Sequence, residues 1–237
     1  MRKFLNIIIF ALYLACASKA YAKNYVVCVG ISDYPGYMND LTVSHRDASY
    51  IANVFRRNGN AEVHCLLNKN ATVSNVVNTM RSVYQKAGAD DAVILFFSGH
   101  GDKGAFRCYN APMSYSAITQ SMKLSHSRKR IVFADACMSG SMRNNNRKGG
   151  DESIDIMFFL SSRTSEPSRE ILGMDNSVFT YFLGKGLKGL ADANNDRHIT
   201  ARELFEYVSD KVKAKTRRNQ HPVMWGNFND NMTVMRW

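Results

Sequence analysis

The sequence is poor in residues that cross-link or interrupt a chain. It has five cysteines and four prolines in 237 residues, and no two cysteines stand at the CxxC spacing of zinc and redox motifs. After residue 22 no apolar run is long enough to span a bilayer, and no segment repeats. These absences argue against a zinc site built from cysteines, a later membrane span and a repeat architecture.

Acidic residues are scarce relative to basic ones. Lys and Arg number 31 against 20 Asp and Glu, which gives a formal net charge of +11. A protein with this balance can adhere to anionic surfaces. The sequence contains no basic stripe interleaved with aromatic residues, so we expect no nucleic-acid partner.

The first 22 residues have the composition of a secretory signal peptide. Arg2 and Lys3 precede the apolar stretch FLNIIIFALYLACASKA, and Ala-Tyr-Ala then provides a small-x-small cleavage site. We expect cleavage after Ala22, one domain over 23–237, and a secreted or periplasmic protein that no longer contacts the membrane. An uncleaved anchor and lipidation at Cys16 are the alternatives.

Cleavage would leave an even number of cysteines, which permits two disulfides in an exported chain. They are Cys28, Cys65, Cys108 and Cys137. Cys28 and Cys65 lie in apolar, strand-like segments and could pair if these strands are neighbours. A buried free thiol is the alternative for each.

Hydrophobic periodicity predicts an alternation of strands and helices. Predicted strands lie within 24–32, 61–68, 90–104, 129–137, 155–163 and 221–227. Predicted helices lie within 44–57, 72–88, 115–126, 177–187 and 200–215. Strands that are apolar throughout are typical of a mostly parallel sheet covered on both faces, and reactive groups then gather at the carboxyl edge of the sheet.

Two of these strands end in unusual loops, Ser-Gly-His-Gly at 98–101 and Asp-Ala-Cys-Met-Ser-Gly at 135–140. His100 stands between two glycines and has no side-chain cover from its neighbours. If the strands are adjacent, His100 and Cys137 meet at one edge as a nucleophile and its proton partner. The backbone N–H groups of Gly101 and Cys137 could hold the oxyanion. The alternatives are a core or disulfide cysteine and a loop histidine bonded to backbone.

The segments FFSGHG and DACMSG, in this order, resemble the histidine and cysteine blocks of the caspase-like cysteine peptidases. The resemblance extends to VGISDYPG, LTVSHRDA and FTYFLGKGLKGLADANNDRHITARELFEYV, nearly all of 23–237. It implies a caspase-like three-layer α/β/α sandwich with a mostly parallel sheet of about six strands. It also implies an endopeptidase with Cys137 as nucleophile and His100 as general acid. Asp-Ala-Cys, where animal caspases carry Gln-Ala-Cys, is similar to bacterial members and metacaspases.

The resemblance further implies cleavage after Arg or Lys. An aspartate two residues before the nucleophile lies beside the substrate side chain, and its carboxylate favours a cation. In metacaspases an aspartate of the first helix and the serine before Gly-His-Gly complete this pocket. The positions are Asp135, Asp47 and Ser98 here, so the expected partners are proteins or peptides with basic residues. The alternatives are another specificity such as Asp, for which Arg163 could supply charge, and an inactive caspase-like binding module.

The polar segment 143–153 corresponds to the loop that is often cut in caspases. Arg143, Arg147 and Lys148 are candidate self-cleavage sites in this loop. An uncut flexible loop is the alternative.

A second motif, at 192–203, has the spacing of an EF-hand calcium loop. Its candidate ligands are Asp192, Asn194, Asp196, His198, Thr200 and Glu203. Arg197 stands where the sharp turn favours glycine, so it must adopt a left-handed conformation. A helix-loop-helix connection capped by Asp and Asn is the alternative. We expect catalysis itself to require no cofactor.

Overall fold

The computed structural model describes residues 22–58, 60–102, 104–136, 156–162 and 173–236. Its centre is a six-stranded sheet with the strand order β10-β8-β7-β3-β1-β2. All neighbouring pairs are parallel except β10 and β8 at one edge. The strands are β1 (Asn24–Gly30), β2 (Ala61–Leu67), β3 (Ala92–Gly99), β7 (Lys129–Ala136), β8 (Ile156–Leu160) and β10 (Val223–Trp225).

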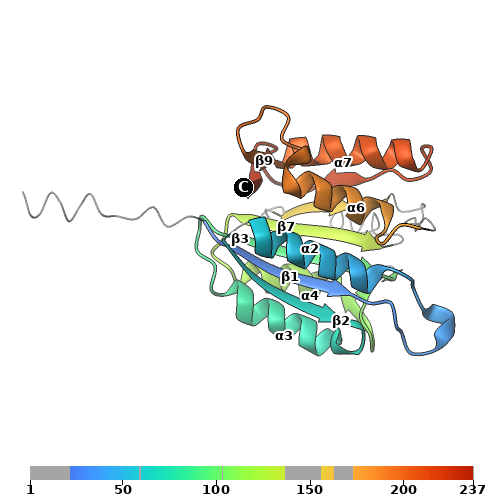
Figure 1. Ribbon diagram of the computed structural model, residues 1–237. Helices are drawn as coiled ribbons and strands as arrows, with labels where there is room; N and C mark the ends of the chain where they lie inside the picture. Colours follow the sequence, from blue (N-terminus) through green and yellow to red (C-terminus); the bar gives the residue numbers. More distant parts are fainter. Residues whose placement is uncertain (1–21, 59, 103, 137–155, 163–172, 237) are drawn as a thin grey trace, which may run out of the picture.

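Helices cover both faces of this sheet (Figure 1). One face carries α2 (Ser44–Asn58), α6 (Val178–Lys185) and α7 (Ala201–Lys215). The other face carries α3 (Val73–Tyr84) and α4 (Tyr115–Lys123). The predicted three-layer α/β/α sandwich with a mostly parallel sheet of six strands is therefore confirmed.

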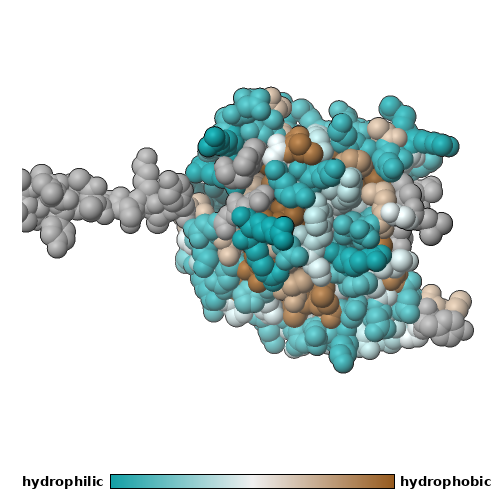
Figure 2. Space-filling model, viewed as in Figure 1, coloured by the Kyte–Doolittle hydropathy of each residue, from teal (hydrophilic) through white to brown (hydrophobic). Residues whose placement is uncertain are grey.

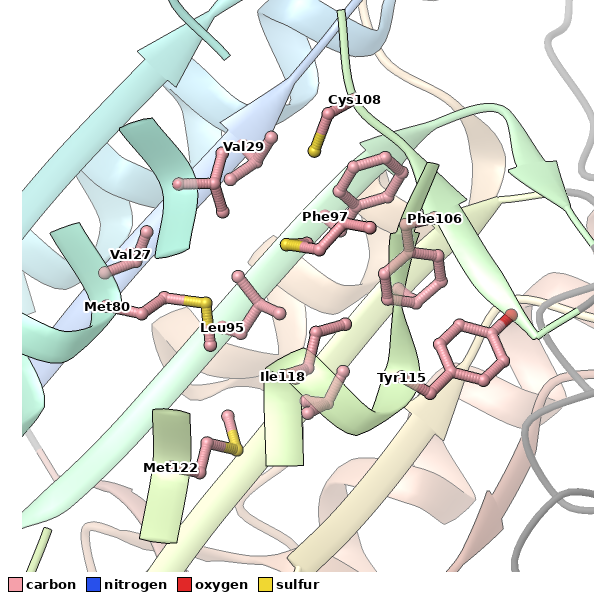
Figure 3. Packing of buried hydrophobic residues seen from close by; sticks show 14 of the residues in the cluster. Val27, Val29, Met80, Leu95, Phe97, Phe106, Cys108, Tyr115, Ile118 and Met122 are labelled. Atoms are coloured by element: carbon pink, nitrogen blue, oxygen red, sulfur yellow. The ribbon is translucent and has the colours of Figure 1, made fainter. Parts of the chain in front are cut away.

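Both faces of the central strands are buried, which explains their almost continuous apolar sequences. Along β3, every residue from Val93 to Phe97 is fully buried. Figure 3 shows the core between the sheet and the α3–α4 layer, where Phe97 stacks on Phe106 with ring centroids 4.5 Å apart. Met80 of α3 and Met122 of α4 fill the same layer. This packing holds the end of β3, and with it the His100 loop.

Two small sheets escaped the sequence analysis. After β3 the chain forms an antiparallel sheet of β4 (Gly101–Asp102), β5 (Ala105–Arg107) and β6 (Pro112–Ser114). Near the C-terminus β9 (His198–Thr200) pairs with β11 (Thr233–Arg236). Two 3-10 turns, Tyr37–Asn39 and Asn68–Asn70, and a π turn at Gly186–Leu190 complete the described elements.

Cys28 and Cys65 lie directly opposite each other on the neighbouring strands β1 and β2. Their thiols are not bonded, and Cys108 is also a free thiol. Burial raises the pKa of the Cys28 thiol well above its ordinary value, so this group stays protonated and unreactive. Within the described ranges, no helix combines the length and the apolar character that crossing a bilayer requires.

Candidate active site

The two strands with unusual ends are neighbours in the sheet and finish together. β3 and β7 run parallel in register, with Ser98 opposite Asp135 and Gly99 opposite Ala136. The chain therefore leaves the sheet toward His100 beside the point where it leaves toward Cys137. Cys137 itself lies outside the described residues, as do the candidate cleavage sites Arg143, Arg147 and Lys148.

The imidazole of His100 is held from one side by backbone. Its Nε2 lies 2.7 Å from the carbonyl oxygen of Asn39, in the 3-10 turn after β1. A carbonyl only accepts hydrogen bonds, so Nε2 must carry the proton in this contact. In the neutral ring Nδ1 is then the nitrogen able to take up a proton. Asn39 was not identified from sequence, because a backbone acceptor leaves no signature in its side chain.

The phenol of Tyr34 fixes the backbone of the same loop. Its oxygen accepts a hydrogen bond from the N–H of His100 at 3.0 Å and donates to the carbonyl of Arg107 at 3.1 Å. Burial raises the pKa of the Tyr34 phenol above its ordinary value, so it remains a donor. The rings of Tyr34 and His100 also lie 4.9 Å apart between centroids.

Gly99 is required by this arrangement. A Cβ at this position would lie 2.6 Å from the Tyr34 phenolic oxygen. Any side chain here would displace Tyr34 and remove the support of the His100 backbone. The absence of a side chain at Gly99 thus leaves room for Tyr34, which supports the His100 backbone. This role is more specific than leaving the imidazole uncovered.

The three residues expected to form an acidic pocket come together beneath the His100 loop. Asp47 lies in the first turn of α2, Ser98 near the end of β3, and Asp135 near the end of β7. The Ser98 hydroxyl donates to Asp47 Oδ2 at 3.0 Å. Asp47 is completely buried and Asp135 is 4% exposed. These three positions lie together although they come from segments far apart in the chain.

Three further residues of this network were missed. Asn176 Nδ2 donates to Asp47 Oδ1 at 2.9 Å, and the backbone N–H of Ser177 donates to the same oxygen at 3.1 Å. The hydroxyls of Ser177 and Thr180 both donate to Asp135 Oδ2, the latter at 2.8 Å. Ser177 is also the N-cap of α6. The helix therefore directs its first turn, with its partial positive charge, at the two carboxylates.

The hydrogen bonds to Asp47 do not fully offset the free-energy cost of burying its charged form. Burial is the largest cause that raises the pKa of this carboxyl from 3.8 to about 8, and the nearby charge of Asp135 is the second. The hydrogen bonds from Asn176, Ser98 and Ser177 act in the opposite direction. Asp47 therefore holds a proton at neutral pH, and a cation brought between the two carboxylates would favour its release.

The candidate calcium loop is folded around its own hydrogen bonds. The carboxylate of Asp192 accepts from the backbone N–H groups of Asp196 at 3.3 Å and Arg197 at 3.0 Å. Arg197 has the expected left-handed conformation, with φ of 64°. Glu203 forms a capping box with Thr200 at the start of α7. No three His, Cys, Asp or Glu side chains in the described part of the chain are grouped as metal ligands, so calcium here stays a prediction.

Comparisons with known proteins agree with this geometry. The family model of the caspase domain matches residues 23–232. A crystal structure of a protein from Geobacter sulfurreducens superposes with a TM-score of 0.67 at 14% sequence identity, over 91% of this chain and 97% of the other. At that identity the likeness shows a shared fold. No curated protein matches the sequence. Since the family model covers most of the sequence, this chain belongs to the caspase-like family of peptidases.

Proposed function

We propose that the chain is an exported cysteine endopeptidase that cleaves peptide bonds after Arg or Lys. The observation that carries the specificity is the buried pair of Asp47 and Asp135. Ser177 links the two carboxylates in the network that contains Ser98, which lies two residues before His100. A buried carboxylate pair favours a cationic side chain and repels an anionic one.

In the proposed reaction Cys137 is the nucleophile and His100 its proton partner. The Cys137 thiol gives its proton to Nδ1 of His100, the resulting thiolate attacks the carbonyl carbon, and the N–H groups of Gly101 and Cys137 hold the oxyanion that forms. As the C–N bond breaks, His100 gives its proton to the departing amine. Water then hydrolyses the thioester and regenerates the thiol. The bond from His100 Nε2 to the Asn39 carbonyl supports this assignment, because it orients the ring and leaves Nδ1 for the transferred proton.

The acidic pocket would hold the substrate side chain before the scissile bond. A guanidinium can donate two parallel hydrogen bonds to a carboxylate, and an ammonium offers a point charge. Entry of either cation would favour loss of the proton on Asp47. We therefore expect Arg to be preferred over Lys, and both over a neutral side chain of the same shape.

Two alternatives make different predictions. A peptidase specific for Asp would require a cation in the pocket; Arg163, the candidate for it, lies outside the described residues. The two buried carboxylates make the pocket unfavourable for an anion. A binding module without activity would not need an oriented imidazole, and the Asn39 and Tyr34 contacts to His100 favour the enzyme.

The test uses peptides that differ only in the residue before the scissile bond: Arg, Lys, citrulline or Asp. We expect cleavage after Arg and Lys, at least about 100-fold slower cleavage after citrulline, and none by Cys137→Ala or His100→Ala. Cleavage after Asp but not after Arg or Lys would refute the specificity. If Cys137 failed to react with a peptidyl electrophile under reducing conditions, the binding module would be favoured.

Processing and export are separate parts of the proposal. We propose self-cleavage in 143–153, so incubation of the wild type should produce new N-termini after Arg143, Arg147 or Lys148 that Cys137→Ala lacks. We also propose removal of residues 1–22 during export. Sequencing the N-terminus of protein recovered outside the cytoplasm should give Lys23.

A further inference from the structure

Three lysines and three tyrosines gather on the face of the molecule that α2, α6 and α7 form. They are Tyr50, Tyr181, Lys185, Lys188, Tyr207 and Lys211, here called the lysine–tyrosine surface. Each lysine ammonium lies over a tyrosine ring, with nitrogen-to-centroid distances of 4.8 Å for Lys185 and Tyr181, 5.1 Å for Lys188 and Tyr50, and 5.8 Å for Lys211 and Tyr207. Figure 1 shows α2 and α6 side by side with α7 next to α6, and Figure 2 shows hydrophilic side chains over much of this face.

The three lysines of this surface form no ion pair with a described residue. Within the described residues, the ion pairs of lysine side chains are those of Lys23 and Lys86 with Glu62, on a different part of the sheet. The Tyr181 oxygen, as the acceptor of a hydrogen bond that the Lys185 ammonium donates, is the largest cause that raises the pKa of Lys185. The neighbours that act on Lys185 electrostatically are tyrosines, and none is a carboxylate. Each of the three ammonium groups thus lies against a tyrosine ring, and none of them forms an ion pair with a described residue.

The ring of Tyr50 is held in place by close packing against α6. Gly184 of α6 lies directly beneath the ring of Tyr50, and a Cβ there would be 2.1 Å from Tyr50 Cε1. The missing side chain lets the tyrosine of α2 lie flat against α6. Tyr50 then supports Lys188 from below. The six residues come from three helices and one turn, which is why no basic and aromatic stripe is visible in the sequence.

This surface begins beside the acidic pocket. Tyr50 follows Asp47 by three residues on α2, about 4.5 Å along a helix axis. On α6, Tyr181 directly follows Thr180, which donates to Asp135. The first turns of both helices lie at the edge where β3 and β7 end (Figure 1). A substrate whose basic side chain occupies the pocket therefore has the lysines within reach of neighbouring parts of its chain.

We propose that the lysine–tyrosine surface is a second substrate-binding site, which takes an acidic segment of the protein that is being cut. This inference rests on the proposed function, since it assumes that a basic residue enters the Asp47–Asp135 pocket. The preferred substrate class is then a protein with Arg or Lys close to a run of Asp and Glu. Opposite charges at the two sites would orient the substrate and accelerate its encounter with the enzyme.

The experiment compares peptides with one cleavage sequence and either an acidic tail or a Gly/Ser tail, placed before or after the scissile bond. At low ionic strength we expect the acidic tail, on one of the two sides, to raise kcat/KM about tenfold, and the gain to disappear in 0.5 M salt. Lys185→Ala and Lys188→Ala should each reduce that gain about two- to fivefold and leave the Gly/Ser peptide unchanged. Lys123→Ala, on α4 at the opposite face, is the matched control and should keep the full gain.

An acidic tail without effect on either side would overturn the proposal, as would an equal loss of the gain in Lys123→Ala. If no peptide is cleaved, the proposed function fails and binding alone decides the second site. A fluorescent acidic-tail peptide should then still bind the wild type in a salt-sensitive way and bind Lys185→Ala more weakly. If the peptide does not bind and the protein is instead retained on vesicles of anionic lipid, the surface is assigned to a membrane. That result would refute the peptide site.

Discussion

Replacing Asp47 by Asn should stabilise the fold at alkaline pH and weaken cleavage after Arg. Asparagine can keep every hydrogen bond at this position. Its Oδ1 can accept from Asn176 and from the Ser177 N–H, and its amide can donate to the Ser98 hydroxyl, which is free to act as an acceptor. The substitution therefore removes the buried charge and leaves the network in place.

The magnitude follows from the pKa of Asp47, which burial raises from 3.8 to about 8. Between these two values the folded state holds a proton that the unfolded state has lost, so stability falls as pH rises. At 1.36 kcal/mol per pH unit the full difference is about 6 kcal/mol, an upper limit reached above pH 8. Between pH 6 and pH 9 the same linkage predicts that the wild type loses roughly 3 kcal/mol more than Asp47→Asn.

Urea unfolding followed by tryptophan fluorescence, in reducing buffer at intervals from pH 5 to pH 9, measures this difference. The stability curves should diverge with rising pH, with the variant more stable at pH 9. Parallel curves, or a wild type that is the more stable at pH 9, would refute the reasoning. Asp47→Ala is the control: it leaves Asn176 and Ser98 without an acceptor and should be less stable than Asp47→Asn at every pH. Loss of one charge partner should lower kcat/KM for Arg peptides about 10- to 100-fold in Asp47→Asn.

Further predictions concern groups around the site and at the chain end. Tyr34→Phe removes the acceptor of the His100 N–H, so kcat should fall about tenfold with little change in binding of an Arg-containing inhibitor, and unchanged kcat would contradict the assigned support. Cleavage after residue 22 would turn the Lys23 nitrogen, 2.8 Å from Asp91 Oδ1, into an ammonium group. Asp91→Asn should then lower the free energy of unfolding by about 1 kcal/mol more in a chain that starts at Lys23 than in an N-terminally extended one. Urea unfolding of both chains measures this difference. Activity should persist in EDTA, and a calcium-dependent rise in Tm that Asp192→Asn abolishes would be the sign of a bound ion.

The sheet and its helices could be predicted because their signals are local. Apolar runs and helical periodicity lie within each segment, and the parallel sheet follows from their alternation. The end of α3 shows where this fails. The predicted helical segment extended to residue 88, but α3 ends at Tyr84, and the N–H of Ala87 turns back to the Tyr84 carbonyl at 3.0 Å. The Ala87 carbonyl accepts from His126 at 3.2 Å, so a tertiary contact sets the boundary.

The small strands were missed for a related reason. β9 and β11 are each short, and β9 finds its partner about 35 residues later in the chain. Neither has enough residues for a periodic pattern to emerge from the surrounding loop. Their pairing is determined by the packing of α7 and the C-terminal segment, which a local pattern does not contain.

The residues of the candidate site also fall into those that could be predicted from the sequence and those that could not. His100, Asp47, Ser98 and Asp135 were placed by motif resemblance and by the expectation that parallel strands end at one edge. Asn176 was not, because its partner Asp47 lies 129 residues away in sequence. A serine before an apolar helix is recognisable as an N-cap, but the carboxylate that its hydroxyl also reaches depends on how α6 packs on the sheet.

The architecture also bears on what a cut in 143–153 would do. Such a cut would break the covalent link between β7 and β8. These strands nevertheless pair from Arg130 to Ala134, and Phe133 and Phe159 meet edge to face across them. The hydrogen-bond network of Asp47 and Asp135 spans the same division, with the carboxylates before the cut and the donors Asn176 and Thr180 after it. The two fragments would remain associated through buried hydrogen bonds and apolar contacts. Self-cleavage should therefore alter the segment that follows Cys137 in sequence, and with it kcat, while the preference for Arg and Lys is retained.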